Sequence, residues 1–178
     1  MENWAWERAV LDRFARHWQT GEPLPEPLFE RLKSVRTFRA ASAQMRQLGF
    51  AALDMALHTG YAPAPQESFL DFARRIMQPY APAPLTEDYA MVASFGHLFA
   101  HSVGYAAGYY AYKWAEVLDA DAFGRFAREG LFNRDLGRRW RDEVLAVGDS
   151  RDPLEVFVGF MGREPDPEAL MRRQGLVP

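Results

Sequence analysis

The chain has 178 residues and a mass of 20.3 kDa, which suits a single domain spanning residues 1–178. Hydrophobic residues make up 48% of it and charged residues 25%, which excludes a disordered or low-complexity protein. Because cysteine is absent, a disulfide scaffold, a thiolate metal site and a cysteine nucleophile are excluded, and a reducing, cytoplasmic location is predicted.

The formal charge is -3, from 21 basic and 24 acidic residues, and Lys33 and Lys113 are the two lysines. Nucleic-acid binding needs a concentrated cationic face, so this balance predicts no nucleic-acid partner. The local arginine group at Arg138, Arg139 and Arg141 is where such a face would lie. Apolar runs are too short to cross a membrane and residues 1–4 lack the pattern of a signal peptide, so no membrane partner is expected either.

The sequence of the first half of the chain predicts helices separated by proline-rich loops. Apolar residues recur every three or four positions from Asn3 to Trp18, which predicts an amphipathic helix. A loop from Thr20 to Pro25 follows, and Pro27 then suits the first turn of a helix that runs through Val35. A long helix is predicted from Phe38 to His58, with Gly60 as its cap.

The second half continues in the same way. Further helices are predicted at 66–77, 107–126, 133–147, 153–160 and 168–173. No convincing strand pattern and no internal repeat is found. The predicted fold class is therefore all-α, with roughly seven helices around one core, and the helices at 38–58 and from about residue 107 should be among the longest.

Three tyrosines form the first candidate site. Tyr105, Tyr109 and Tyr112 are spaced i, i+4 and i+7, so a helix carrying them would present three phenols on one face. Protonated phenols can donate hydrogen bonds to a substrate carbonyl or an oxyanion. Gly104 and Gly108 would let the backbone bend or approach a ligand closely. The alternative is a tyrosine stripe in the core whose hydroxyls bond to neighbours.

Two histidines form the second candidate site. His97 and His101 are four residues apart, the spacing at which one helix face offers two imidazoles to a metal. A zinc peptidase motif H-E-x-x-H has a glutamate directly after the first histidine, where this chain has Leu98. The third ligand would have to be Glu116 or Asp119. The alternative is one functional or core histidine beside an incidental one.

Several segments resemble the thimet oligopeptidase and oligopeptidase A family of zinc metallopeptidases, and the resemblance covers practically the whole chain in order. The matching segments are 1–7, 17–25, 46–48, 54–58, 104–117, 132–134 and 160–165. The most specific of them reads Gly-Tyr-Ala-Ala-Gly-Tyr-Tyr-Ala-Tyr-Lys-Trp-Ala-Glu-Val, from Gly104 to Val117.

The resemblance implies an all-α lobe that borders the substrate channel of an enzyme cutting short peptides. Tyr105, Tyr109 and Tyr112 correspond to tyrosines that hydrogen-bond the substrate and the tetrahedral oxyanion in that family. His97 corresponds to the family histidine because it follows Phe95-Gly96. The stretch from His97 to Tyr105 looks about two residues longer than the family's turn, which leaves His101 as the other candidate.

The family's H-E-x-x-H and third zinc ligand precede the Glu-Asn-Trp that here begins at Glu2, so the chain resembles only the C-terminal part of such an enzyme. Two functions are consistent with this. The chain is either a non-catalytic peptide-binding protein, or half of a split zinc peptidase that becomes active when an upstream chain supplies the metal site. Alone, it is expected to hold no catalytic zinc, because a metal and a carboxylate base are both required for hydrolysis.

A lobe taken from a larger fold is expected to expose apolar surface. Trp4, Trp6 and the first helix are the predicted exposed edge. Because contiguous apolar patches tend to be buried by association, a homodimer is expected, with the upstream peptidase segment as the alternative partner.

Overall fold

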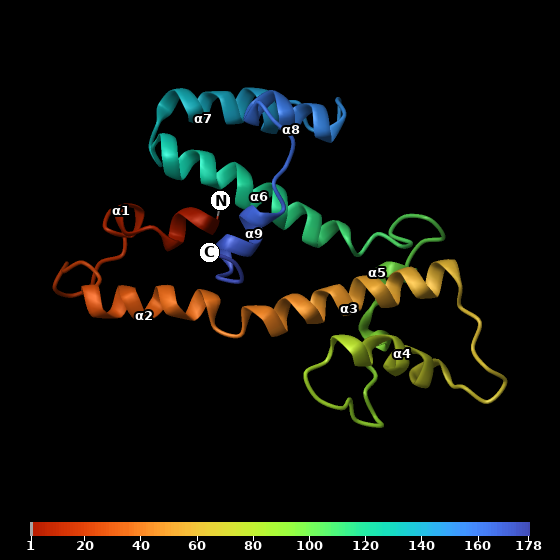
Figure 1. Cartoon of the computed structure of the whole chain (residues 1–178). Helices are drawn as coiled ribbons and strands as arrows, with labels where there is room; N and C mark the ends of the chain where they lie inside the picture. Colours follow the sequence, from red (N-terminus) through yellow and green to blue (C-terminus); the bar gives the residue numbers. More distant parts are fainter. Residues whose placement is uncertain (1) are drawn as a thin grey trace. The chain divides into compact units, whose positions relative to one another are not determined.

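A computed structural model describes residues 2–178 and consists of helices joined by turns and loops (Figure 1). The helices are η1 (Glu2–Trp6), α1 (Arg8–Leu11), α2 (Glu26–Thr37), α3 (Ala40–Thr59), α4 (Phe69–Met77), η2 (Gln78–Tyr80), η3 (Met91–Ser94), α5 (Gly96–Phe99), α6 (Ala111–Glu129), α7 (Arg134–Trp140), η4 (Arg141–Leu145), α8 (Pro153–Met161) and α9 (Glu168–Arg173). An isolated bridge between Arg16 and Pro23 is the β-pairing found within residues 2–178. The predicted all-α class is therefore confirmed.

The chain divides into two compact units. The first contains the described residues up to Phe38 together with 117–178, and the second contains 39–116. The second unit is organised by α3, which packs along α4. Phe50 and Leu53 of α3 are buried against residues of α4, η3 and α5, among them Leu98. Ser68 begins α4 with a capping box, in which Ser68 and Asp71 each satisfy the other's backbone amide.

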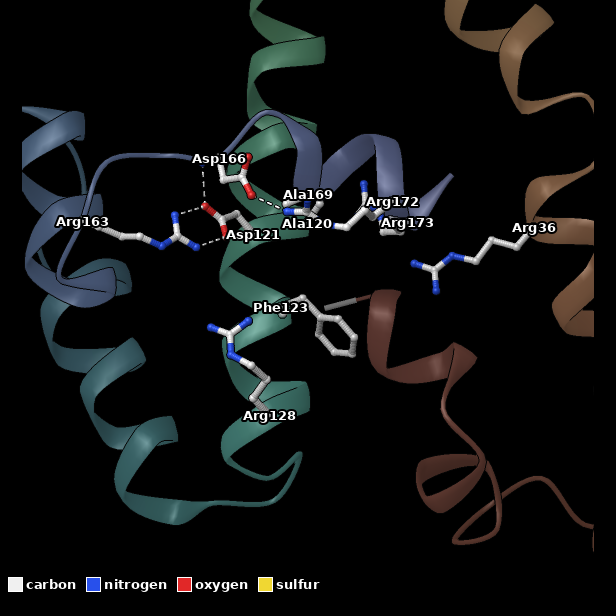
Figure 2. A pocket seen from close by; sticks show the side chains of 11 residues that line it. Arg36, Ala120, Asp121, Phe123, Arg128, Arg163, Asp166, Ala169, Arg172 and Arg173 are labelled. Carbon is white, nitrogen blue, oxygen red and sulfur yellow. Dashed lines mark hydrogen bonds and ion pairs between the residues drawn. The ribbon is translucent and has the colours of Figure 1, made fainter. Parts of the chain in front are cut away.

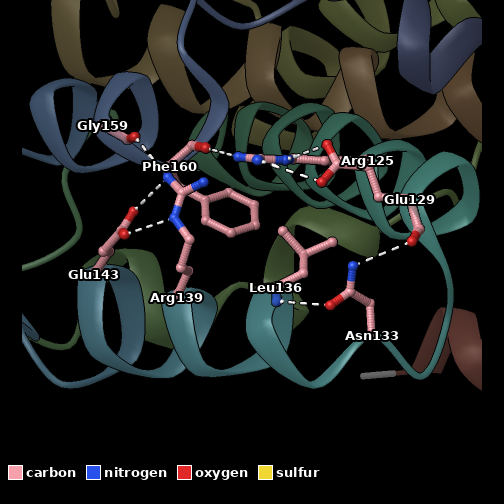
Figure 3. Close-up of polar contacts among 8 residues, drawn as sticks. All are labelled: Arg125, Glu129, Asn133, Leu136, Arg139, Glu143, Gly159 and Phe160. Atoms are coloured by element: carbon pink, nitrogen blue, oxygen red, sulfur yellow. Dashed lines mark hydrogen bonds and ion pairs between the residues drawn. The ribbon is translucent and has the colours of Figure 1, made fainter.

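The core of the first unit lies between α6, α7 and α8. Phe126, Leu136 and Phe160 are buried there, with Trp140 edge-on against Phe160. Polar contacts surround this core, as Figure 3 shows: Arg125 bonds to the Phe160 carbonyl and pairs with Glu129, and Arg139 pairs with Glu143. Asn133 caps α7 by accepting from the amides of Asp135 and Leu136. The apolar interior and its polar rim thus fix these three helices together.

The C-terminal helix α9 is held to the first unit by a buried carboxylate. Asp121 of α6 accepts from both Nη atoms of Arg163, at 2.6 and 2.7 Å, and from the Asp166 amide at 2.8 Å. Burial opposes ionisation of Asp121, but these hydrogen bonds outweigh it and hold its pKa below the ordinary value. Leu170 of α9 adds an apolar contact with Val117 and Ala120.

The predictions for α2, α3, α8 and α9 are confirmed within one to three residues, and α3 and α6 are the two longest helices of residues 2–178. The predicted helix at 66–77 starts later, at Phe69. The one at 133–147 is α7 followed directly by the π-helical turn η4. None of the helices in the described part of the chain is both long and apolar enough to cross a membrane.

The predicted helix from Asn3 to Trp18 is wrong. The structure has the short 3-10 helix η1, the single turn α1, and then turns that lead to the Arg16 bridge. Tertiary contacts override the periodicity, because the Asn3 amide donates to both oxygens of Asp119 and the Trp4 indole donates to the Leu131 carbonyl.

The predicted exposed edge is wrong for Trp4 and Trp6 and agrees with the structure for the later part of the predicted first helix. Trp4 is half-buried and meets Phe123 and Phe126 edge-on, and Trp6 is half-buried beneath the Arg36 guanidinium. The exposed aromatic side chains of this region are Phe14 and Trp18, which are 65% and 84% exposed. The exposed apolar side chains of the predicted segment 3–18 therefore lie in its second half, after α1.

The arginine group at 138–141 is paired with carboxylates. Arg138 pairs with Asp135, Arg139 with Glu143 and Arg141 with Asp142. Because each cation has an acidic partner on the same segment, the group does not form a concentrated cationic face.

Candidate functional site

The candidate residues lie in the second unit, in α5, in the first turn of α6 and in the segment between them. Phe95 and Leu98 are buried, and they anchor a short turn that leaves His97 exposed. Tyr109 is buried, Tyr105 is half-buried and Tyr112 is 44% exposed. The three tyrosines therefore range from core to surface and are not all sealed inside.

The four aromatic side chains predicted to act together lie together. The His97 ring is 5.2 Å from that of Tyr105 and 6.3 Å from that of Tyr109, measured between ring centroids. Tyr112 stacks on Tyr105 at 5.9 Å and meets Tyr109 edge-on at 5.2 Å. A histidine and three phenols thus form one continuous cluster, which is called the tyrosine cluster below.

The prediction that one helix carries the three tyrosines is wrong. Helix α6 begins at Ala111, so Tyr105 and Tyr109 lie in turns before it and Tyr112 lies in its first turn. Ala107 has a φ of 55°, a left-handed conformation that a helix does not allow and that costs an alanine about 1 kcal/mol. A Cβ at Gly108 would lie 3.1 Å from the Tyr105 carbonyl oxygen, so this tight turn favours glycine there.

Tyr109 is fixed from the interior by two hydrogen bonds to α3. Its hydroxyl donates to Gln47 Oε1 at 2.8 Å, and its backbone amide donates to Asp54 Oδ2 at 2.8 Å. The Tyr109 ring also packs against Phe50 and Phe95. The position of this tyrosine is therefore set by α3 and not by the helix that follows it.

Asp54 is the functional residue that sequence reasoning missed. Its side chain is 1% exposed, and besides the Tyr109 amide it meets His58, whose Nδ1 lies 2.9 Å from Asp54 Oδ1. The same Nδ1 is 2.9 Å from the Asp54 carbonyl oxygen, and the His58 ring stacks on Phe99. Asp54 and His58 belong to a segment that resembles the oligopeptidases, which was the available signal, but nothing in the sequence links them to Tyr109.

The phenols of Tyr105 and Tyr109 keep their protons at neutral pH. A hydrogen bond with Tyr112, together with burial, raises the pKa of Tyr105 above its ordinary value. Burial raises the pKa of Tyr109, against the smaller opposing influence of Arg46. Because the ordinary value is already about 10, both groups are hydrogen-bond donors under physiological conditions.

His101 does not join the tyrosine cluster in the way that His97 does. It lies beyond the end of α5, and its Nδ1 accepts the backbone amides of Val103 at 3.2 Å and Gly104 at 3.1 Å. One imidazole nitrogen is therefore committed to the turn. His97, by contrast, lies against Tyr105 and Tyr109.

The residues present do not fit a zinc ion. No group of three or more histidine, aspartate or glutamate side chains that could hold a metal is found within residues 2–178. The two carboxylates considered as a third ligand have other partners, since Glu116 pairs with Lys113 and Asp119 pairs with Arg173. A structural or catalytic zinc needs at least three protein ligands in tetrahedral arrangement, which this set does not supply.

Comparison with known proteins places the chain among peptidases. The sequence pattern of peptidase family M3 matches residues 1–176. The chain is 48% identical over 182 residues to the organellar oligopeptidase A of Arabidopsis thaliana and 48% identical over 182 residues to the probable cytosolic oligopeptidase A of the same plant. It is 40% identical over 176 residues to the oligopeptidase A of Escherichia coli strain K12.

These matches cover 99% of this chain but only 23%, 26% and 26% of the three relatives. The chain thus spans about a quarter of the length of the curated relatives it matches, and the matching part is their C-terminal portion.

Proposed function

Because this chain belongs to peptidase family M3, we propose that it forms the peptide-binding side of an oligopeptidase fold and does not hydrolyse peptides by itself. The observation that carries the proposal is the tyrosine cluster. It combines three hydrogen-bonding phenols and an exposed imidazole, and one of its members, Tyr109, is fixed by two bonds to the interior.

In this proposal the phenols recognise the main chain of a peptide. A protonated phenol donates one hydrogen bond, which suits a peptide carbonyl oxygen or the oxyanion that develops from it. Tyr112 is the most exposed of the three and Tyr105 is half-buried beside it, so these two hydroxyls meet the ligand. His97 adds a donor or acceptor at the same edge, which favours it over His101 as the family histidine.

Hydrolysis requires more than recognition. An amide is cleaved by this class of enzyme only when a metal polarises the carbonyl and a carboxylate accepts a proton from water. Donors that stabilise an oxyanion give no turnover unless a nucleophile creates that charge. The residues described here do not fit zinc, so the chain alone is proposed to bind peptide without cutting it.

A second function is favoured by how firmly the cluster is held. Tyr109 is positioned by Gln47 and Asp54 without any residue outside this chain, so its part of the site is already in place for a partner that brings the metal. The alternative proposal is therefore half of a split zinc oligopeptidase. An open reading frame beside this gene that encodes H-E-x-x-H and a third glutamate would favour it.

The binding proposal is tested by fluorescence anisotropy with labelled short peptides. Tyr112→Phe should weaken binding by about tenfold, because it removes a hydroxyl that bonds the ligand. Tyr110→Phe is the matched control, since Tyr110 is 56% exposed and belongs to the same turn. Absence of saturable binding by the unaltered chain, or equal losses in the two variants, would show that the cluster is not a peptide site.

The non-catalytic proposal is tested by metal analysis of the purified protein and by a quenched-fluorescent peptide assay with added zinc. No cleavage is expected from the chain alone. Stoichiometric zinc with chelator-sensitive cleavage, lost when His97 and His101 are replaced, would overturn the proposal. Zinc-dependent cleavage that arises only when a second chain with the metal motif is mixed in would establish the split enzyme.

We also propose that the chain associates through the exposed apolar surface after α1, as a homodimer or with the upstream peptidase segment. Phe14 and Leu28 line a hollow of about 390 Å³ in the first unit. Trp18 is the most exposed large apolar side chain described in that unit. Light scattering should give a dimer that Trp18→Ser weakens and Trp114→Ser does not. A monomer at all concentrations would count against the homodimer.

The proposed location is cytoplasmic, supported by the absence of cysteine and by the name of one plant relative.

A further inference from the structure

A second cavity, separate from the tyrosine cluster, lies in the first unit and has a volume of about 270 Å³. Five arginines line it: Arg36, Arg128, Arg163, Arg172 and Arg173. They come from α2, α6, the segment after α8, and α9. In Figure 2, Arg128 and Arg36 lie on opposite sides of Phe123, each at its own edge of the cavity. Two aspartates, Asp121 and Asp166, also line the cavity, which leaves an excess of positive charge in its wall.

Three of the five arginines are neutralised by carboxylates of the fold. Arg163 is bound end-on by Asp121. Arg172 pairs with Asp166 and with Glu168, and Arg173 pairs with Asp119. The two aspartates that line the cavity, Asp121 and Asp166, are thus paired with arginines, and these pairs compensate the negative charge of both aspartates.

The other two arginines have no carboxylate partner. Arg128 makes no hydrogen bond or ion pair with any residue of 2–178, so its whole guanidinium fork is available. Arg36 Nη2 donates to the neutral Asn3 Oδ1 at 2.8 Å, and the same oxygen accepts from Arg173 Nη1 at 3.1 Å. Two guanidinium groups therefore share one uncharged acceptor, and Arg36 itself forms no ion pair within residues 2–178.

The electrostatics of Arg36 agree with this geometry. Burial and the neighbouring Arg173 lower the pKa of Arg36, and the smaller opposing effects of Glu7 and Asp119 do not restore it. A bound anion would reverse both effects, since it would supply the missing opposite charge and the missing acceptors. The cavity thus has a cationic wall, unused donors and room for a small ligand.

We propose that this cavity binds a phosphate group, either as a phosphate monoester or as inorganic phosphate. A phosphate has three acceptor oxygens and carries nearly two negative charges at neutral pH, so it can accept from the guanidinium of Arg128, and the positive charge of Arg36 at the other edge of the cavity favours the same anion. Arginine forks match phosphate bidentately and are weakly hydrated, which favours them over lysine in such sites. The buried Phe123 and the small Ala120 and Ala169 in the same wall leave space for the organic part of a monoester.

Isothermal titration calorimetry of the purified chain at low salt tests the proposal, with phenyl phosphate, inorganic phosphate and benzoate as probes. Saturable one-to-one binding of phenyl phosphate or phosphate is expected, with benzoate weaker. Arg128→Gln should lower the affinity by about tenfold, because it removes a charge-assisted bond, and Arg36→Gln should lower it by less, because it removes only a positive charge from the wall. Arg128→Lys should weaken it as well, since the fork is lost while the charge stays.

Arg31→Gln is the matched control, because Arg31 is exposed on the same helix as Arg36 and does not line the cavity. Its affinity should equal that of the unaltered chain. Tighter binding of phenyl phosphate than of phosphate would identify a monoester as the ligand, and the reverse order would identify inorganic phosphate. No saturable binding, benzoate binding as tight as phosphate, or the same loss in Arg31→Gln would overturn the proposal. Arg128 is itself exposed, so its variants are expected to fold, and circular dichroism checks this.

Discussion

Replacing Asp54 with alanine should loosen the loop that carries Tyr109. The carboxylate is 1% exposed, and its loss leaves the Tyr109 amide without an acceptor and removes one of the two oxygens that lie 2.9 Å from His58 Nδ1. A buried donor left unsatisfied costs about 1 to 3 kcal/mol, and the broken contact with His58 brings the expected loss of unfolding free energy to about 2 to 4 kcal/mol. Urea denaturation followed by circular dichroism measures this loss.

The specific readout is hydrogen exchange at the Tyr109 amide. In Asp54→Ala this amide should exchange faster than the drop in global stability accounts for, because Asp54 is its acceptor. Asp54→Asn is the control, since an amide oxygen can still accept from Tyr109, and it should retain most of the protection. If the Tyr109 amide stays as protected in Asp54→Ala as in the unaltered chain, the positioning role assigned to Asp54 is refuted.

Three further predictions concern the first unit. Phe160→Ala should lower the unfolding free energy by about 3 to 5 kcal/mol in urea titration, because its ring is 1% exposed; a loss below about 1 kcal/mol would mean that the core is not packed as described. Asp121→Asn should destabilise at pH 7, and the difference from the unaltered chain should shrink below about pH 4, since a carboxylate with a lowered pKa stabilises only while ionised; a constant difference across pH would contradict this. Asn133→Ala should cost about 1 kcal/mol in thermal unfolding through loss of the α7 cap, whereas an unchanged midpoint would show that the cap contributes nothing.

Much of the fold could be predicted from local sequence. Helix α3 combines strong helix formers with a glycine at its end, and α9 follows a proline and precedes a glycine. Helix propensity and the residues that begin or end helices were therefore enough to predict both. The same reasoning failed where partners lie far along the chain. Asn3 bonds a residue 116 positions away, and no local window of the sequence contains that information.

The residues predicted for the candidate site lie close together, but their backbone differs from the prediction. Tyr105, Tyr109 and Tyr112 do meet, but through turns and not along one helix face. The left-handed Ala107 could not be anticipated, because alanine is the best helix former and its neighbours also fit a helical period. The contacts of Tyr109 with α3, which hold this segment in place, are not visible in the local sequence.

The buried carboxylate of Asp54 is better explained by positioning than by stability. Replacing a buried ionic group by a well-packed apolar residue is often neutral or stabilising, so a core of Phe50, Leu53 and Leu98 gains little from an aspartate among them. A leucine in place of Asp54 could not accept a hydrogen bond from the Tyr109 backbone amide, which lies between α5 and α6. Apolar contacts alone would not fix the conformation of that turn. The aspartate selects one, and that conformation is the one in which Tyr109 stands beside His97 and Tyr112.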